Sequence, residues 1–312
     1  MPLYAAIDVG SNTFRLLIGN IKEDGITDVL YERRVTRLGE GVDNAGNLQE
    51  KNIEISLAAL KEFSSFISRY GIKHIKAVAT SALRESSNSD IFIKKVFNDT
   101  GISIEVISGE KEAEFTLRGV VASFPKSILA EHTLFIIDIG GGSTEWILHD
   151  KNIVDMGSIP LGVIKLSGNF IKTDPISASD IKRINSAIIP FLDALKIKIG
   201  KYINRNTLFI GTAGTFSTIA SIDLCLETYS REKIHLHRLS LERLLDMSRR
   251  LYPLTLDKRK KVKGLEPERA DLIIPGIQFT INVMDFFGFD ELTVSDYGLL
   301  EGVLIEMFQG ER

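Results

Sequence analysis

Two Gly-rich stretches each combine a carboxylate with hydroxyl groups, a pattern that suits phosphate chemistry. The first, residues 5–18, is AAIDVGSNTFRLLI, and the second, residues 134–148, is LFIIDIGGGSTEWIL. An apolar run that meets glycines predicts a buried strand entering a tight turn, followed by a returning strand. Because glycine lets an anion approach the backbone N–H groups closely, either turn could hold a phosphate oxygen.

The two stretches match each other around the turn. Their equivalent positions are Ile7/Ile137, Asp8/Asp138, Gly10/Gly140 and Thr13/Ser143. A repeated strand–turn–strand unit predicts two similar α/β halves, whose facing turns would clamp a phosphate chain and its metal ion. A Gly-rich hairpin without a ligand is the alternative for either stretch taken alone.

The residues of the two turns divide into metal and phosphate candidates. Magnesium takes one or two carboxylates together with waters and phosphate oxygens. The candidate metal ligands are Asp138, Glu145 and Asp8. The candidate phosphate-binding residues are Ser11, Asn12, Thr13, Gly140, Gly141, Gly142 and Ser143. The alternative for each aspartate is an Asx-type hydrogen bond that caps its own turn.

Two arginines, a third turn and a basic run extend this set. Arg15 follows the first turn by two residues and Arg84 lies at a strand-to-loop junction; a planar guanidinium matches phosphate oxygens, although a surface position is the alternative. Between a predicted strand and a predicted helix lie Gly211, Thr212, Gly214 and Thr215, where the helix N-terminus favours an anion. The run KRKKVK at 258–263 is either a solvated face or an attractive patch for a polyanion.

Length and composition favour a two-domain globular protein. The chain has 312 residues, of which 44% are hydrophobic and 25% charged. A net charge of −3 argues against a general nucleic-acid binder, and the single Cys225 excludes an internal disulfide framework. Since no apolar run approaches the roughly 20 residues of a membrane helix and no signal-peptide pattern opens the sequence, we expect a cytoplasmic protein.

Periodicity predicts an α/β protein in which each half runs from a hairpin into a βαβ unit. Helices are predicted over 53–70, 86–100, 179–202, 216–224, 241–251 and 298–308, and over 269–287, where Pro275 should kink or divide the helix. Strands are predicted over 26–35, 74–80, 102–107, 153–159, 207–210 and 291–294. This order predicts mixed sheets flanked by helices.

Three further stretches, with the two turns, carry a family resemblance. They are ATSALR at 79–84, ISGEKEA at 107–113 and SDYGLLEGVL at 295–304. The chain resembles the exopolyphosphatase/guanosine pentaphosphatase (Ppx/GppA) family of the actin-like ATPase superfamily. The resemblance implies two actin-like, ribonuclease H-like domains with five-stranded-type mixed sheets and an interdomain cleft. The expected domains are 1–118, 119–297, and a C-terminal helix at 298–312 that returns towards the first.

The resemblance also implies an activity. It implies a Mg²⁺-dependent phosphohydrolase of the stringent-response type that releases terminal phosphate from polyphosphate, guanosine pentaphosphate or both, with Glu112 as the catalytic glutamate. Without it, Glu112 could simply complement a helix dipole. Within the family resemblance, the arginine at position 15 favours guanosine polyphosphates as the substrate. We expect no nucleic-acid or membrane partner, and the resemblance is compatible with a homodimer.

Two other functions remain open from the sequence. One is an ATP-dependent kinase or ATPase of the same superfamily, and the other is a non-enzymatic sensor of guanosine tetraphosphate. Longer relatives add a C-terminal helical module implicated in holding long polyphosphate and in dimerisation, so chain-length preference and oligomeric state stay open.

Overall fold

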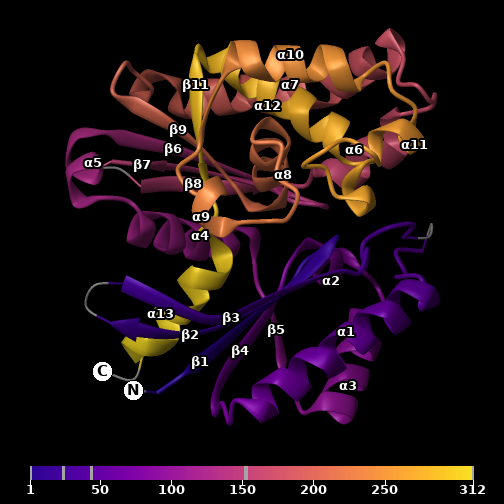
Figure 1. Cartoon of the computed structure of the whole chain (residues 1–312), viewed down its shortest axis with the longest axis vertical. Helices are drawn as coiled ribbons and strands as arrows, with labels where there is room; N and C mark the ends of the chain where they lie inside the picture. The colour runs from indigo at the N-terminus through magenta and orange to yellow at the C-terminus, as the bar shows by residue number, and fades with distance from the viewer. Residues whose placement is uncertain (1, 23–24, 43–44, 151–153, 311–312) are drawn as a thin grey trace. The chain divides into compact units, whose positions relative to one another are not determined.

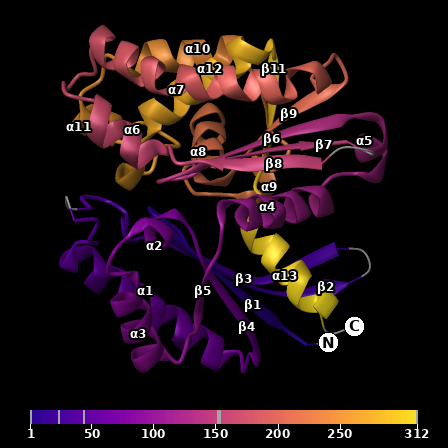
Figure 2. The ribbon, with the colours of Figure 1, turned by 180° about the vertical axis from the view of Figure 1, so that it is seen from behind.

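Two compact units divide the chain, Met1–Ser123 with Tyr297–Arg312, and Phe124–Asp296. The structure is a computed structural model that describes residues 2–22, 25–42, 45–150 and 154–310. Each unit is a mixed sheet with helices packed on it (Figure 1; Figure 2). Among the described residues, no helix combines the length and the apolar character needed to cross a membrane.

The first unit is built on a five-stranded sheet in the order β3-β2-β1-β4-β5. Its strands are β1 (Tyr4–Val9), β2 (Thr13–Lys22), β3 (Gly25–Val35), β4 (His74–Ala79) and β5 (Ile104–Val106). Its helices are α1 (Glu50–Arg69), α2 (Ser81–Glu85), α3 (Ser89–Thr100), α4 (Gly109–Ser123) and α13 (Leu299–Gly310). The central strand β1 is antiparallel to β2 and parallel to β4.

Alternation along β1 divides the core of the first unit into two layers. Ala5, Ile7 and Val9 pack with apolar residues of α1 and α3, whereas Tyr4 and Ala6 pack with those of α4 and α13. Because successive side chains of a strand point to opposite faces, Asp8 belongs to the face covered by α4 and α13. Figure 1 shows these two helices side by side.

The second unit repeats this plan on a six-stranded sheet in the order β10-β11-β9-β6-β7-β8. Its strands are β6 (Thr133–Ile139), β7 (Thr144–His149), β8 (Val154–Ile159), β9 (Thr207–Thr212), β10 (Arg238–Ser240) and β11 (Glu291–Ser295). Its helices are α5 (Lys126–Glu131), α6 (Val163–Phe170), α7 (Ala178–Ile199), α8 (Ala213–Asp223), α9 (Arg231–Ile234), α10 (Leu241–Leu251), α11 (Leu256–Arg259) and α12 (Ile273–Phe287). Single 3-10 turns lie at Gly200–Tyr202 and Pro267–Arg269.

The strand orders confirm the internal repeat. In each unit the first strand pairs antiparallel with the second and parallel with the strand that follows the first long helix, β4 in one unit and β9 in the other. The order β3-β2-β1-β4-β5 therefore corresponds to β8-β7-β6-β9-β11. The repeated turns accordingly occupy the same position in both sheets, at the end of the central strand.

Two details differ from the sequence-based expectation. The short edge strand β10 makes the second sheet six-stranded. Pro275 does not divide its helix, because α12 begins at Ile273 and the proline lies in the first turn, where a backbone N–H has no intrahelical partner. The predicted start of a strand at Ile153 lies outside the described residues.

Candidate active site

The first turn places a carboxylate beside a guanidinium on neighbouring strands. Asp8 of β1 lies opposite Arg15 of β2, and Nη2 of Arg15 is 2.6 Å from Oδ2 of Asp8. The other oxygen, Oδ1, is buried and accepts no hydrogen bond from the described part of the chain. Burial raises the pKa of Asp8 above its ordinary value, although Arg15 opposes this rise. One carboxylate oxygen is thus held by Arg15, and the other can accept a cation or a proton.

Backbone hydrogen bonds set the direction of the first turn. The N–H groups of Thr36 and Arg37 both donate to the carbonyl oxygen of Asn12 at 3.0 Å, and that of Gly39 donates to Ser11 at 2.8 Å. In a planar trans peptide the N–H points away from the C=O, so the N–H groups of Asn12 and Thr13 point away from this loop. The turn therefore directs N–H groups, which favour an anion, to its other side.

The second turn is anchored in the same way. The N–H of Val163 donates to the carbonyl oxygen of Gly140 at 3.0 Å, and that of Ile164 donates to Gly141 at 2.9 Å. By the same peptide geometry, the N–H groups of Gly141 and Gly142 point away from α6. In both units, the segment after the third strand of the repeat binds the carbonyl groups of the turn.

The second unit has a carboxylate where the first has a guanidinium. Asp138 of β6 lies opposite Glu145 of β7, the position that Arg15 occupies opposite Asp8. Their exposed fractions are 6% and 0%, and the hydroxyl of Ser158 donates to Oε1 of Glu145 at 2.7 Å. Two buried carboxylates on adjacent strands repel each other unless a cation or a proton compensates the charge.

The carboxylates of the second turn are oxygen donors of the type that binds magnesium. Asp138 and Glu145 supply two carboxylates, the number that magnesium commonly takes from a protein, with water and phosphate oxygens completing its shell. In the first unit, Oδ1 of Asp8 and Oδ1 of Asn12 are both buried oxygens without a hydrogen-bond partner among the described residues. No group of three or more His, Cys, Asp or Glu residues in 2–22, 25–42, 45–150 and 154–310 could hold a metal by itself. The metal set stays a prediction.

Glu112 lies in the first turn of α4 and is buried, with 7% of its surface exposed. Nη1 of Arg84 is 3.1 Å from Oε2 of Glu112 and also donates to the carbonyl oxygen of Ile107 at 2.9 Å. The hydroxyl of Ser108 accepts the N–H of Lys111 at 3.1 Å and so caps the start of α4. Two residues predicted separately are therefore in contact, and the guanidinium orients the carboxylate.

The third turn owes its glycines to packing. β9 ends at Thr212, and α8 begins at Ala213, whose φ of 66° lies in the left-handed region. A Cβ at Gly211 would overlap the ring of Phe216. The hydroxyl of Thr215 donates to the carbonyl oxygen of Ile139 at 2.8 Å, which ties this turn to the end of β6.

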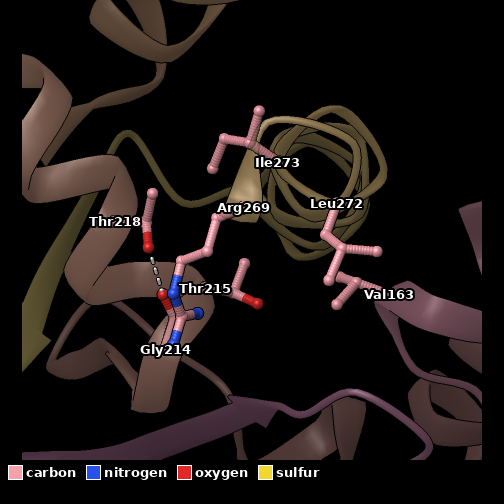
Figure 3. A pocket seen from close by; sticks show the side chains of 7 residues that line it. All are labelled: Val163, Gly214, Thr215, Thr218, Arg269, Leu272 and Ile273. Carbon is pink, nitrogen blue, oxygen red and sulfur yellow. Dashed lines mark hydrogen bonds between the residues drawn. The ribbon is translucent and has the colours of Figure 1, made fainter. Parts of the chain in front are cut away.

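Arg269 lies beside the third turn and was not indicated by the sequence. A Cβ at Gly214 would overlap the guanidinium of Arg269, which is partly buried and whose Nε donates to Oε2 of Glu266 at 3.1 Å. Figure 3 shows the guanidinium directed at Gly214 in a small pocket beside the first turn of α8. The pocket is lined by Val163, Gly214, Thr215, Thr218, Arg269, Leu272 and Ile273. Only a contact between distant segments reveals this residue, because the arginine follows the glycine by many positions.

The basic run at 258–263 does not form one uniform charged face. Arg259 is buried and donates to the carbonyl oxygens of Ala270 at 3.1 Å and Leu254 at 2.8 Å, so it supports the local fold. Lys260 pairs with Asp257. The four lysines of the run are exposed, and a contact with substrate stays a prediction for them.

Known proteins resemble the chain along its whole length. The model of the Ppx/GppA phosphatase family matches residues 17–311. A bifunctional 3-dehydroquinate synthase/phosphatase of Fusobacterium nucleatum is 35% identical over 97% of this chain and 46% of its own length. Exopolyphosphatase 2 of Mycobacterium tuberculosis is 28% identical over 97% and 98% of the two chains. Guanosine-5'-triphosphate,3'-diphosphate pyrophosphatase of Vibrio vulnificus is 28% identical over 100% and 60%.

The chain thus spans less than two thirds of the Fusobacterium and Vibrio relatives and nearly all of the Mycobacterium one. The crystal structure of an exopolyphosphatase from Cytophaga hutchinsonii matches with a TM-score of 0.90 and 32% identity, covering 99% and 98% of the two chains. This likeness confirms the two mixed-sheet α/β domains of the actin-like fold. The chain belongs to the Ppx/GppA phosphatase family.

Proposed function

We propose that this protein is a Mg²⁺-dependent phosphohydrolase that releases the terminal phosphate of inorganic polyphosphate, of guanosine pentaphosphate, or of both. The contact between Arg84 and Glu112 is the observation that supports it best. It gives a phosphatase-family chain a buried, oriented carboxylate, and hydrolysis of a phosphoanhydride needs such a group to orient and deprotonate water.

Each named residue has a role in this proposal. Glu112 accepts a proton from the attacking water, and Arg84 orients its carboxylate. The outward N–H groups of Asn12, Gly141 and Gly142 hold phosphate oxygens. Asp138 and Glu145 would hold magnesium, which when bound supplies positive charge to the departing phosphate oxygens, and Asp8 is the candidate metal ligand of the first unit.

The choice between the two substrates depends on Arg15 and Arg269. The guanidinium of Arg15 is engaged by Asp8, so it binds substrate with its remaining N–H groups or not at all. Arg269 adds positive charge beside the third turn, where a phosphate or another anion of the substrate would bind. Since either guanidinium can bind the phosphates of both substrates, the relative loss of activity on each substrate after removal of Arg15 or of Arg269 identifies the preferred one.

A phosphate-release panel tests the proposal. The substrates are long polyphosphate, short polyphosphate, guanosine pentaphosphate and ATP, each with and without Mg²⁺. We expect release from at least one of the first three, dependent on Mg²⁺. Steady turnover of ATP alone would identify a kinase or ATPase, and binding of guanosine tetraphosphate without release from any substrate would identify a sensor.

A further inference from the structure

The face of α4 that carries Glu112 is packed against α13. Phe115 and Gly119 follow Glu112 by three and seven positions, which places all three on one side of the helix. A Cβ at Gly119 would overlap the carbonyl oxygen of Gly298, and a Cβ at Gly302 would overlap that of Phe115. The two segments therefore touch backbone to backbone, and no intervening side chain can absorb a shift of α4.

Three charged side chains, here called the clamp, lie beside this contact: Glu306, Lys76 and Lys111. The two carboxylate oxygens of Glu306 on α13 take one ammonium each, Lys76 at 2.7 Å and Lys111 at 2.9 Å. Both ammonium groups also lie over the ring of Phe115, at 5.6 and 4.6 Å from its centre. All three charged side chains are partly buried, which limits their screening by solvent. Since Lys111 directly precedes Glu112, the clamp acts on the same turn of α4.

The opposite end of α13 adjoins the first turn of the site. Oε2 of the buried Glu301 accepts the N–H of Gly298 at 2.8 Å and so fixes the start of the helix. Leu299 and Leu300 of the same helix pack in one layer with Ala6 of β1, which lies two positions before Asp8 on the same face of the strand. One helix thus adjoins both Asp8 and the segment that carries Glu112.

We propose that α13 positions Glu112 for catalysis, with Glu306 as the positioning residue that holds α4 through Lys111. The inference rests on the proposed function, because it concerns the orientation of the carboxylate that acts on water. A reacting group displaced by about 1 Å can lose roughly 10²-fold in rate, so a loosened clamp with the helix contact intact should cost about tenfold in kcat.

The test compares two glutamates that pair with the same lysine. Glu306→Gln breaks the clamp, whereas Glu105→Gln on β5 removes the other carboxylate of Lys76, at 3.2 Å, with the same change in charge. With the substrate that the wild type hydrolyses best, Glu306→Gln should lower kcat about tenfold and leave KM within twofold. Glu105→Gln should change none of these, and Glu306→Asp should recover part of kcat.

A second variant tests the route through α4. Lys111→Met removes the same ion pair from the other side, so the double variant Lys111→Met/Glu306→Gln should lose no more kcat than either single variant. Equal kcat for Glu306→Gln and Glu105→Gln, or a lowered Tm with unchanged kcat, would overturn the inference. If Glu112→Gln itself keeps full activity, the proposed function fails instead, and the two failures are told apart.

Discussion

Arg84 and Glu112 meet at the junction between β5 and α4. One nitrogen of the guanidinium, Nη1, binds both Oε2 of Glu112 at 3.1 Å and the carbonyl oxygen of Ile107 at 2.9 Å. Because Ile107 lies just before α4, the arginine fixes the carboxylate relative to the backbone that precedes its own helix. Glu112, the candidate base, is therefore fixed both by the hydrogen bond from Arg84 and by the helix that carries it.

Replacing Glu112 by glutamine should abolish most of the activity while the fold stays intact. Loss of a general base lowers kcat by roughly 10²–10⁴. Steady-state phosphate release measures the loss, and circular dichroism checks the fold. Glu110→Gln is the matched control, since Glu110 is exposed in the same first turn, and its kcat should equal that of the wild type. Near-normal turnover of Glu112→Gln would rule out the base role.

Replacing Arg84 by methionine should lower kcat more than it raises KM. Glu112 then loses the guanidinium that orients its carboxylate, and a reacting group displaced by about 1 Å can lose roughly 10²-fold in rate. Steady-state phosphate release measures both constants, and Arg84→Lys should recover part of kcat. A raised KM with unchanged kcat would assign Arg84 to substrate binding instead.

Replacing Asp138 by asparagine should remove a magnesium-dependent gain in stability. A ligand at 100 times its Kd stabilises the folded state by about 2.7 kcal/mol, so Mg²⁺ should raise the Tm of the wild type and EDTA should reverse the rise. Asp138→Asn should show little of this gain. Asp155→Asn, on β8 of the same unit, should keep it. An equal rise in Tm for both variants would place the ion elsewhere.

Removing Arg269 should weaken substrate binding. A hydrogen bond to a charged group is worth roughly 1.5–3 kcal/mol, so Arg269→Ala should raise KM by about tenfold or more with a smaller change in kcat. Gly214→Ala should act in the same direction, because its Cβ displaces the guanidinium. Arg249→Ala on α10 is the control, since Arg249 is largely exposed. A KM equal to that of the control would remove Arg269 from the site.

Asp180 should make stability depend on pH in the acidic range. Burial alone would raise its pKa, but hydrogen bonds from Thr173 and from the backbone of Ser177 and Lys172 outweigh burial and lower it. A lowered pKa means that this stabilisation is present above the unfolded-state pKa and is lost as the pH falls through the folded-state value.

The change Asp180→Asn removes that pH-dependent contribution. The substitution should lower the free energy of unfolding by roughly 1–3 kcal/mol at pH 7, and this difference from the wild type should become smaller below about pH 4. Urea unfolding of both proteins across this range measures it. Asp193→Asn on the same helix is exposed and should cost almost nothing at any pH. A gap that is constant with pH would show that packing, not charge, is lost.

The repeated turns were predictable because their determinants are local. An apolar run, a glycine and a hydroxyl within ten residues specify strand, turn and strand, and both turns lie where the sequence indicated. The extra edge strand β10 has only three residues, too few for a periodic pattern. The position of Pro275 depended on where α12 begins, a boundary that propensity specifies poorly.

Contacts between distant segments account for the rest. The sequence indicated Arg15 as a phosphate-binding residue and Asp8 as a metal ligand. Only the register of β1 and β2 shows that the two residues pair with each other. The sequence around Gly211 suggested an anion-binding turn. The structure shows that a glycine is required there because a Cβ would overlap the ring of Phe216. Arg269 lacked any local signal, because its partner Gly214 belongs to another helix.

The discontinuity of the first unit has a consequence for its biosynthesis. Leu299, Leu300, Val303 and Leu304 fill one layer of its interior together with Tyr4 and Phe115. A nascent chain that has reached Asp296 has every strand of that unit but leaves this layer open to water. The first unit can therefore fill its interior only after α13 has been synthesised, later than every element of the second unit.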